Sequence, residues 1–403
     1  MSSSTSDDMR PLKILTLDGG GLQALSTLSI LSKLCDAIAI NKASDRKPAP
    51  YELFDIIGGI GTGGWLALLL GRYRLDLTRC MSIYLELASD PQLPATRSLF
   101  GSKPYALDQK RLISKIDSIL ERYELNPSLL DNEAQKTEEG IEVRCKHAFA
   151  VGAIQSSDEG NREYDVFRAY RTTTKTPGPY YRPGPDPESC KVSSVCAATG
   201  ATKYLLQPYT IGSTTYSDNG FPNPHNITEI AMDEAYHIFG EKPPLSIIVN
   251  IGPGIPSDHD IEKLQKLSRK FSWPYWLPSS NRTGLRKANT LNTSPTSSTI
   301  TTSGTKWVES PVRSDTSSSA SSEAEGVERE IEAKIIERLH KDYPDQKIFI
   351  RLAPPPAHDE LALNDVHVIS TSSEEVDKFL RQDTTKKCLR QAAERYCVTS
   401  SAA

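Results

Sequence analysis

Two glycine-rich segments and one acidic loop hold the residues whose types and spacing could do chemistry. The glycine-rich segments are Asp18 to Gly21 (DGGG) and Gly59 to Gly63 (GIGTG). A glycine turn between a strand and a helix directs unpaired backbone N–H groups at one point, which suits a phosphate or a developing oxyanion. Glycine turns also serve close packing, so the first segment alone leaves an anion site and a packing contact equally open.

The second segment has the form of a nucleophile elbow. In that turn, G-x-S-x-G presents a catalytic serine between a strand and a helix. The serine position here is Gly61. Because glycine tolerates positive φ better than any other residue, the turn can persist without the hydroxyl. We therefore expect an elbow backbone that lacks its nucleophile.

The acidic loop is Tyr216 to Gly220 (YSDNG), which contains Asp218. A carboxylate near a serine can act as general base in a two-residue dyad. Without that serine, Asp218 has no hydroxyl to activate. An aspartate that stabilises a turn through its backbone N–H groups is an equally good interpretation.

The elements expected to position these residues follow the same order twice along the chain: a strand, a glycine turn and a helix. A strand at 13–17, a glycine turn and a helix at 22–39 are followed by a strand at 54–57, glycines 58–64 and a helix at 65–70. This repetition predicts a parallel sheet covered by helices. Further strands are expected at 147–154, 245–251 and 347–352, and helices at 105–123, 227–239, 327–341 and 374–396.

Composition divides the chain into one domain with appendages. Residues 1–9 and 279–325 are rich in serine and threonine or otherwise polar, and we expect both to be disordered. Residues 10–278 are predicted to form the core. Residues 326–403 are predicted to complete that same domain.

Charge and cysteine content exclude several classes of protein. The 47 lysines and arginines balance 51 acidic residues, so the net charge of −4 predicts no nucleic-acid partner. The seven cysteines are scattered and lack CxxC spacing, which favours free thiols over a disulfide framework or a zinc site. No apolar run reaches the ~18 residues of a membrane-spanning helix, so a cytoplasmic location is expected.

Five segments together resemble the patatin-like phospholipase family, in the cytosolic form common in fungi. The segments are LTLDGGGLQALSTLSIL, FDIIGGIGTGGWLALLLGR, VFRAYR, VCAATGATKYL and YSDNGFPNPHNITEIAMDEA. The resemblance covers residues 10–255 and 327–397. It implies an α/β fold, a patatin-like three-layer sandwich with a largely parallel central sheet flanked by helices.

The resemblance also implies site roles. It assigns the family's nucleophile position to Gly61, where the serine is absent, and the base position to Asp218. It assigns the N–H groups of the oxyanion hole to Gly19, Gly20 and Gly21. The family's motifs also change elsewhere, at Gln23, Ala24, Ile60, Gly200, Lys203 and Asn219.

These changes favour a pseudohydrolase that binds a lipid or acyl ester without Ser-Asp hydrolysis. We count Thr62 with the oxyanion and ligand-binding residues, since it follows the nucleophile position. One alternative is an active hydrolase that uses water activated by Asp218, or a displaced nucleophile such as Thr62. Another is a non-enzymatic scaffold, whose protein partners the sequence does not identify. No cofactor or metal is expected.

Aromatic residues beside a basic segment suggest a local membrane contact. Residues 261–270 have helical spacing and several lysines and arginines, and Trp273 and Trp276 follow them. Aromatic rings near cations are typical of interfacial lipid contacts. Packing of both tryptophans against the edge of the core is the alternative.

Overall fold

The fold was determined as a computed structural model. It describes residues 10–20, 24–90, 107–130, 142–155, 163–172, 181–202, 206–218, 227–240, 242–252, 319–344, 348–354 and 376–398. The predicted disordered segments 1–9 and 279–318, the membrane-contact residues Trp273 and Trp276, and Gly21 lie outside the described residues. The boundary expected after residue 278 lies outside them too.

A seven-stranded sheet forms the centre of the molecule, in the order β5-β4-β3-β2-β1-β8-β9. Neighbouring strands are parallel except for β3 and β4. The strands are β1 (Leu12–Leu17), β2 (Ile56–Ile60), β3 (His147–Ala153), β4 (Tyr164–Arg168), β5 (Tyr181–Arg182), β8 (Leu245–Ile251) and β9 (Phe349–Leu352). A separate hairpin pairs β6 (Tyr209–Ile211) with β7 (Thr214–Tyr216). The largely parallel sheet confirms the sequence prediction.

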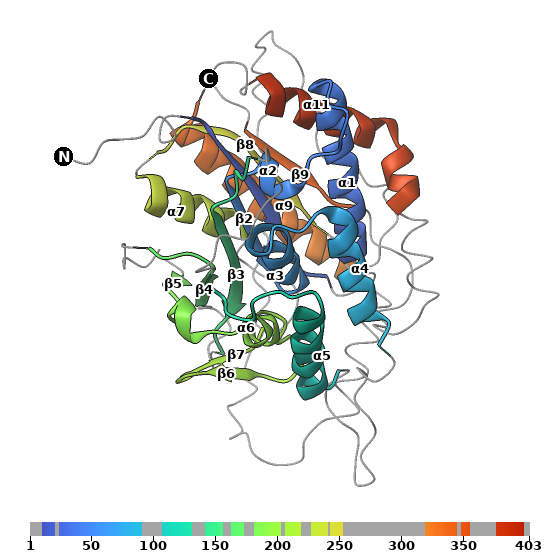
Figure 1. Ribbon diagram of the computed structural model, residues 1–403. Coiled ribbons are helices and arrows are strands. Elements are labelled where there is room, and N and C mark those ends of the chain that lie inside the picture. The colour runs from blue at the N-terminus through green and yellow to red at the C-terminus, as the bar shows by residue number, and fades with distance from the viewer. Residues whose placement is uncertain are drawn as a thin grey trace, which may run out of the picture.

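Helices cover both faces of the sheet (Figure 1). Alternate residues of β1 point to opposite faces, so Leu15 joins one hydrophobic cluster and Ile14 the other. The Leu15 face is packed by α1 (Ala24–Asn41), α3 (Thr62–Ala67), α4 (Leu77–Ala88), α5 (Gln109–Arg122), α6 (Val192–Thr199) and α11 (Asp383–Val398). The Ile14 face is packed by α7 (Ile227–Phe239) and α9 (Ser319–Asp342). The result is the three-layer sandwich that the resemblance implied.

The C-terminal segments join the same sheet as the N-terminal ones. Strand β9 pairs with β8 through Val249 and Ile350, and α11 lies beside α1. Helix α9 begins at Ser319 rather than near residue 327, so the end of the segment expected to be disordered is helical. Alanine and glutamate in Ser319 to Glu325 favour the earlier start.

The second glycine run begins as strand, not as turn. Gly58 and Gly59 continue β2, and position 58 is glycine because a Cβ there would lie 2.3 Å from the Phe149 ring of the neighbouring strand. The predicted turn from residue 58 is therefore wrong by three residues. It starts at Gly61, and the α3 helix follows and passes into a π-helical turn, Leu68–Arg72. Short helices are also described at Pro50–Leu53 (α2), at Pro187–Ser189 and at 376–381.

Helix α1 corrects the expectation that no apolar run has membrane-spanning length. Among the described helices it is long and apolar enough by composition, with a mean hydropathy of 1.3 over 18 residues. In the fold, 61% of that stretch is buried, between the sheet and α11. A buried core helix accounts for this hydropathy without a membrane.

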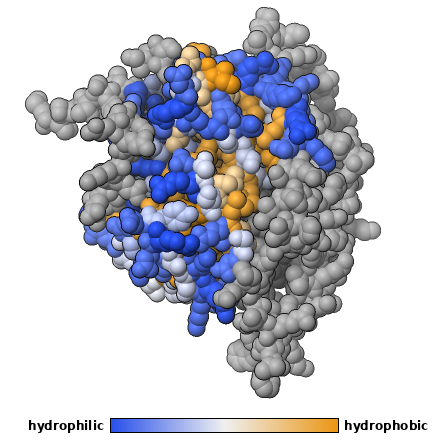
Figure 2. All heavy atoms as spheres, turned by 45° about the vertical axis from the view of Figure 1, so that its right-hand side comes forward, coloured by the Kyte–Doolittle hydropathy of each residue, from blue (hydrophilic) through white to orange (hydrophobic). Residues whose placement is uncertain are grey.

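The side of the molecule that carries α1, α4 and α11 is not uniformly polar. Figure 2 shows a band of apolar residues running down this face between hydrophilic ones. The exposed large apolar side chains among the described residues include Ile40, at 79%, and Val398, at 66%. Both stand at the C-terminal ends of their helices, where single exposed apolar residues are common.

Candidate functional site

The two glycine turns leave the sheet at the same edge. Strands β1 and β2 are parallel neighbours, with Leu17 opposite Gly59, so both end there. Ligands of open α/β sheets bind outside the carboxyl ends of the strands. The fold therefore places the residues singled out from the sequence at the edge where chemistry is expected.

Crowding explains the outer glycines of the second turn. A Cβ at Gly59 would lie 2.1 Å from the Gly63 carbonyl oxygen. A Cβ at Gly63 would lie 2.2 Å from the Leu17 carbonyl oxygen. Both contacts are far inside van der Waals distance, so this strand-to-helix turn can form only with glycine at these two positions.

Gly61 differs from these two glycines because it has space. Among the described residues, a Cβ there would lie within 4 Å of only the Gly19 Cα, at 3.3 Å, and the Thr199 carbonyl oxygen, at 4.0 Å, so the Gly19 backbone would need to shift by a few tenths of an ångström. Its backbone has φ 59° and ψ −132°, and it caps the N-terminus of α3. A residue with a side chain adopts these backbone torsions only under strain, and the serine of a nucleophile elbow is held in a strained backbone of this kind. The position is therefore open in volume and strained in backbone.

Thr199 fixes the position of Gly61. Its Oγ1 accepts the Gly61 N–H at 2.8 Å and donates to the Val151 carbonyl oxygen at 2.5 Å. Thr199 ends α6, in the VCAATGATKYL segment. The resemblance pointed to that segment, but sequence reasoning missed the residue, because nothing in its spacing marks a threonine as the partner of a backbone N–H.

Thr62 connects the two glycine turns. Its hydroxyl accepts the Gly20 N–H at 3.0 Å and is hydrogen-bonded to the hydroxyl of Tyr84. Burial raises the pKa of Tyr84 well above its ordinary value, although the Thr62 hydrogen bond acts against that rise. The Thr62 side chain is 6% exposed. The Gly20 N–H is thus already engaged, while Gly19 is exposed beside Gly61.

Asp18 anchors the first glycine turn to strands β8 and β9. Its Oδ2 accepts from Arg351 Nη1 at 2.7 Å, and its Oδ1 accepts from Asn250 Nδ2 at 3.1 Å. Arg351 and Asn250 come from β9 and β8, and they also contact each other. Sequence reasoning missed both residues, because 333 positions separate Arg351 from Asp18 and no local motif links them.

Asp218 lies at the same edge of the sheet. Its N–H donates to the Ala201 carbonyl oxygen at 2.6 Å, and the preceding Ser217 N–H donates to Ala153 at 2.9 Å. The Asp218 loop is therefore joined to the end of β3 and to the chain directly after α6, which holds Gly61 through Thr199. Both the base role and the turn role remain compatible with this placement.

Metal-binding groups are not found in the part of the chain that the structure describes: it contains no cluster of three or more His, Cys, Asp or Glu. All seven cysteines are free thiols, and six are buried. Burial raises the pKa of Cys35 to about 12 and that of Cys145 to about 12, so both are protonated and unreactive at neutral pH.

Comparison with known proteins gives the site its context. The sequence pattern of the patatin-like phospholipase family matches residues 15–231, just over half of the chain. The chain is 26% identical to calcium-independent phospholipase A2-gamma of rabbit and of mouse over 248 residues, which is 61% of this chain. It is 46% identical to Phospholipase A I of Arabidopsis thaliana over 76 residues, or 19% of this chain and 5% of that protein.

The chain spans under a third of the length of these curated relatives, 28% of the rabbit protein and 29% of the mouse protein. The family pattern nevertheless includes both glycine turns, the Thr199 segment and Asp218, the parts that meet at the carboxyl edge of the sheet. Together with the three-layer fold, this match means that the chain belongs to the patatin-like phospholipase family.

Proposed function

We propose that this protein is a pseudohydrolase that binds a lipid or acyl ester at the carboxyl edge of the sheet without Ser-Asp hydrolysis. The observation that carries the proposal is the contrast among the three elbow glycines. Crowding requires glycine at Gly59 and Gly63, whereas a Cβ at Gly61 would approach the nearest described atom only to 3.3 Å, so a side chain there needs no more than a small shift. The relatives named as phospholipases support a lipid ester as the ligand class.

Hydrogen bonding argues against Thr62 as a replacement nucleophile. Its hydroxyl is buried and already bonded to Gly20 and Tyr84. Reaching a substrate would break both interactions and would turn the side chain around the elbow. A displacement of even ~1 Å can lower a rate about a hundredfold.

A slow water-based hydrolase is the second candidate. The volume beside Gly61 supports it, since a water there would face the exposed Gly19. Asp218 would then act as general base. Without a covalent intermediate to divide the barrier, we expect such a reaction to be slow.

The free thiols support a proposal for the cellular location of the protein. Seven unpaired cysteines are typical of a reducing compartment. We therefore propose that the protein acts in the cytoplasm, where acyl esters of membrane lipids are accessible from the aqueous side.

The deciding experiment compares hydrolysis of p-nitrophenyl butyrate and of phosphatidylcholine by four purified proteins. They are the natural protein, Gly61→Ser, Gly61→Ser with Asp218→Ala, and the control Gly212→Ser. Gly212 has φ +60°, close to the φ of 59° at Gly61, and no described atom within 4 Å of its Cβ position, but it lies in the β6–β7 hairpin. Binding of an ether-linked phosphatidylcholine, which cannot be hydrolysed, is measured alongside by equilibrium dialysis.

A pseudohydrolase predicts that the natural protein and Gly212→Ser bind the ether lipid and hydrolyse nothing. It also predicts that Gly61→Ser gains activity that Asp218→Ala removes. If the natural protein hydrolyses either ester and a further single variant, Asp218→Ala, does not, the water mechanism replaces the pseudohydrolase. If none of the four proteins binds the ether lipid, the proposal of ligand binding at this edge is wrong.

A further inference from the structure

Five polar side chains form one continuous chain of hydrogen bonds at the carboxyl edge of the sheet. They are Thr228, Thr16, Asn250, Asp18 and Arg351. The sheet register sets three of them side by side, because Thr16 on β1 pairs with Asn250 on β8, and Asn250 pairs with Arg351 on β9. Asp18 follows Thr16 by two residues, so it points to the same face of the sheet. The register therefore gathers these side chains on one face.

Asn250 is the junction of this chain of hydrogen bonds. Its Nδ2 donates to Thr16 Oγ1 and to Asp18 Oδ1, both at 3.1 Å, and its Oδ1 accepts from Arg351 Nη1. The residue is fully buried, and these three contacts use both amide hydrogens and the carbonyl oxygen. An aspartate here could not donate, and a leucine could make none of the three contacts. The geometry therefore specifies a carboxamide at position 250.

Arg351 supplies the positive charge that faces Asp18. Its Nη1 donates to Asp18 Oδ2, at 2.7 Å, as well as to Asn250. The side chains of Arg351 and Asp18 are 10% and 19% exposed, so the pair is largely shielded from water. Gly252 leaves room for the pair, since a Cβ there would lie 2.9 Å from Asp18 Oδ2. Charge-assisted bonds shielded in this way are stronger than those of exposed pairs, so Arg351 holds the first residue of the DGGG turn in place.

Thr228 carries the chain of hydrogen bonds to α7. Its hydroxyl lies 3.0 Å from that of Thr16, and both residues are fully buried. Thr228 is the second residue of α7, and α7 is the first described segment after Asp218. Asn250 is thus anchored from α7 on one side and from β9 on the other. The same contacts link the DGGG turn with the helix that follows Asp218.

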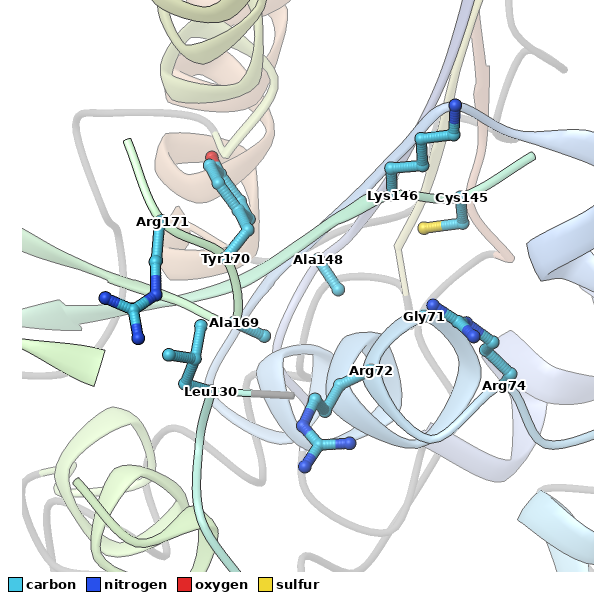
Figure 3. A pocket seen from close by; sticks show the side chains of 10 residues that line it. All are labelled: Gly71, Arg72, Arg74, Leu130, Cys145, Lys146, Ala148, Ala169, Tyr170 and Arg171. Atoms are coloured by element: carbon cyan, nitrogen blue, oxygen red, sulfur yellow. The ribbon is translucent and has the colours of Figure 1, made fainter. Parts of the chain in front are cut away.

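The opposite edge of the sheet shows contacts of a different kind. A pocket of about 420 Å³ lies there, near the start of β3 (Figure 3). Arg72 in its lining donates to the Leu129 carbonyl oxygen at 2.9 Å, and Arg171 pairs with Glu188. These contacts are local to that edge. The chain through Asn250 instead crosses three strands and reaches the candidate site.

We propose that Asn250 and Arg351 are positioning residues of the candidate site, which hold the DGGG turn in the shape that a bound ligand meets. This role rests on the ligand binding proposed above for the carboxyl edge. Both residues lie beyond residues 15–231, the part of the chain that the family pattern matches. Strand β9 therefore shapes the site from outside that pattern.

Hydrogen exchange at single glycine amides tests the hold on the turn without any ligand. The protein is produced with isotope-labelled glycine, and NMR measures the exchange rates of two amides. One is Gly20, in the DGGG turn, whose N–H donates to Thr62 Oγ1. The other is Gly61, in the elbow, whose N–H donates to Thr199 Oγ1. Loss of overall stability would affect both amides, whereas release of the first turn affects Gly20 alone.

The variants are Arg351→Met and Asn250→Leu. Arg144→Met is the matched control, because Arg144 and Asp55 form a similarly buried ion pair, with side chains 13% and 6% exposed. That pair lies at the opposite edge of the sheet, since Asp55 directly precedes β2. Thermal melts check that each variant is folded. If Asn250→Leu does not fold, Arg351→Met decides the outcome.

We expect Gly20 to exchange about tenfold faster in both variants, the effect of losing one charge-assisted hydrogen bond, with no change at Gly61. Arg144→Met should leave the rate at Gly20 unchanged. If Gly20 keeps its natural rate in Arg351→Met, or if Gly20 and Gly61 accelerate alike, the proposal is wrong.

Binding of the ether-linked phosphatidylcholine then tests whether the shape of the turn matters to a ligand. We expect the Kd to rise about tenfold in Arg351→Met and to stay unchanged in Arg144→Met. An unchanged Kd in Arg351→Met, despite faster exchange at Gly20, would contradict the role in ligand binding. If the natural protein binds no ether lipid, the function proposed above fails, while faster exchange at Gly20 alone still supports the hold on the turn.

Discussion

The elbow around Gly61 and the buried ion pair between β4 and α7 are two polar regions held together in opposite ways. At the elbow, backbone N–H groups meet threonine hydroxyls and glycines touch, with no charged side chain in the turn. Between β4 and α7, Arg168 donates to both Glu234 oxygens, at 2.7 Å and 2.6 Å, and Glu234 is fully buried.

This difference teaches which parts of the protein can lose a side chain. The elbow is shaped by its backbone and its neighbours, so the chemistry of residue 61 can vanish while the turn persists. The ion pair consists of side chains alone. Burial opposes ionisation of Glu234, but hydrogen bonds from His237 and Arg168 outweigh it and lower its pKa to about 2. Removing either partner takes away the opposite charge that faces a buried ion.

The largest expected effect tests the crowding of the elbow. In Gly63→Ala the new Cβ would meet the carbonyl oxygens of Leu17 and Asp18 at 2.2 Å and 2.6 Å. We expect a loss of more than about 4 kcal/mol in the free energy of unfolding, measured by urea denaturation. Gly61→Ala is the matched comparison. Equal stability of the two variants would contradict the distinction between required and unoccupied glycines.

The second effect concerns the ion pair. Glu234→Gln keeps the shape of the side chain but removes the negative charge that faces the buried Arg168, so we expect a loss of about 3–5 kcal/mol in the same measurement. The double variant Arg168→Met with Glu234→Leu removes both charges and is expected to recover most of that loss. A double variant as unstable as Glu234→Gln would show that packing, not charge, dominates there.

The third effect is a pH dependence next to the ion pair. Burial, aided by the charge of Lys146, lowers the pKa of His147 to about 4. Between pH 6.5 and 4 the unfolded chain binds a proton at this position and the folded chain does not, so stability falls as the pH falls through this window. The upper bound is about 3 kcal/mol.

His147→Phe isolates that contribution. Phenylalanine keeps the edge-on ring contacts with Tyr170 and Phe239, whose centroids lie 4.8 Å and 5.3 Å from the His147 ring. Urea denaturation at a series of pH values should give a flatter profile for the variant from pH 6.5 down to 4. An unchanged slope in this window would place the proton uptake elsewhere.

The smallest effect belongs to Gly61→Ser. The nearest described atom, the Gly19 Cα, lies 3.3 Å from the new Cβ position, so a small backbone shift and the strained torsions oppose the side chain, at about 1–3 kcal/mol. A thermal melt of Gly61→Ser beside Gly212→Ser measures this cost, since both have nearly the same φ. A Gly61→Ser protein that fails to fold would mean that the elbow no longer accepts a nucleophile.

Sequence reasoning recovered the parts of the fold that local patterns encode. Strands β1 and β8 and helix α7 were predicted within two residues, because buried runs and helical spacing are local signals. The turn at residue 58 was misplaced, because a run of glycines is itself a turn signal. Gly58 instead lies in the strand, where the absence of a side chain makes room for the Phe149 ring of the neighbouring strand.

The residues of the candidate site were likewise predicted only in part. The motifs located Gly61, the glycines and Asp218 by their own spacing, and the resemblance supplied their roles. The groups that fix those residues, Thr199 and Arg351, are defined by contacts across the fold. No periodicity or spacing reports a contact of that kind, so only the structure identifies them.

The contact between Asp18 and Arg351 also sets an order of assembly. Among the described strands β1 comes first in the chain, while its anchor Arg351 lies on β9, which comes last. Contacts of such large sequence separation form late, because the intervening chain must first be closed into a loop. A nascent chain that already holds β1 to β8 still has an unanchored DGGG turn. The carboxyl edge beside β1 is thus completed only once β9, 333 positions further along the chain, has been synthesised.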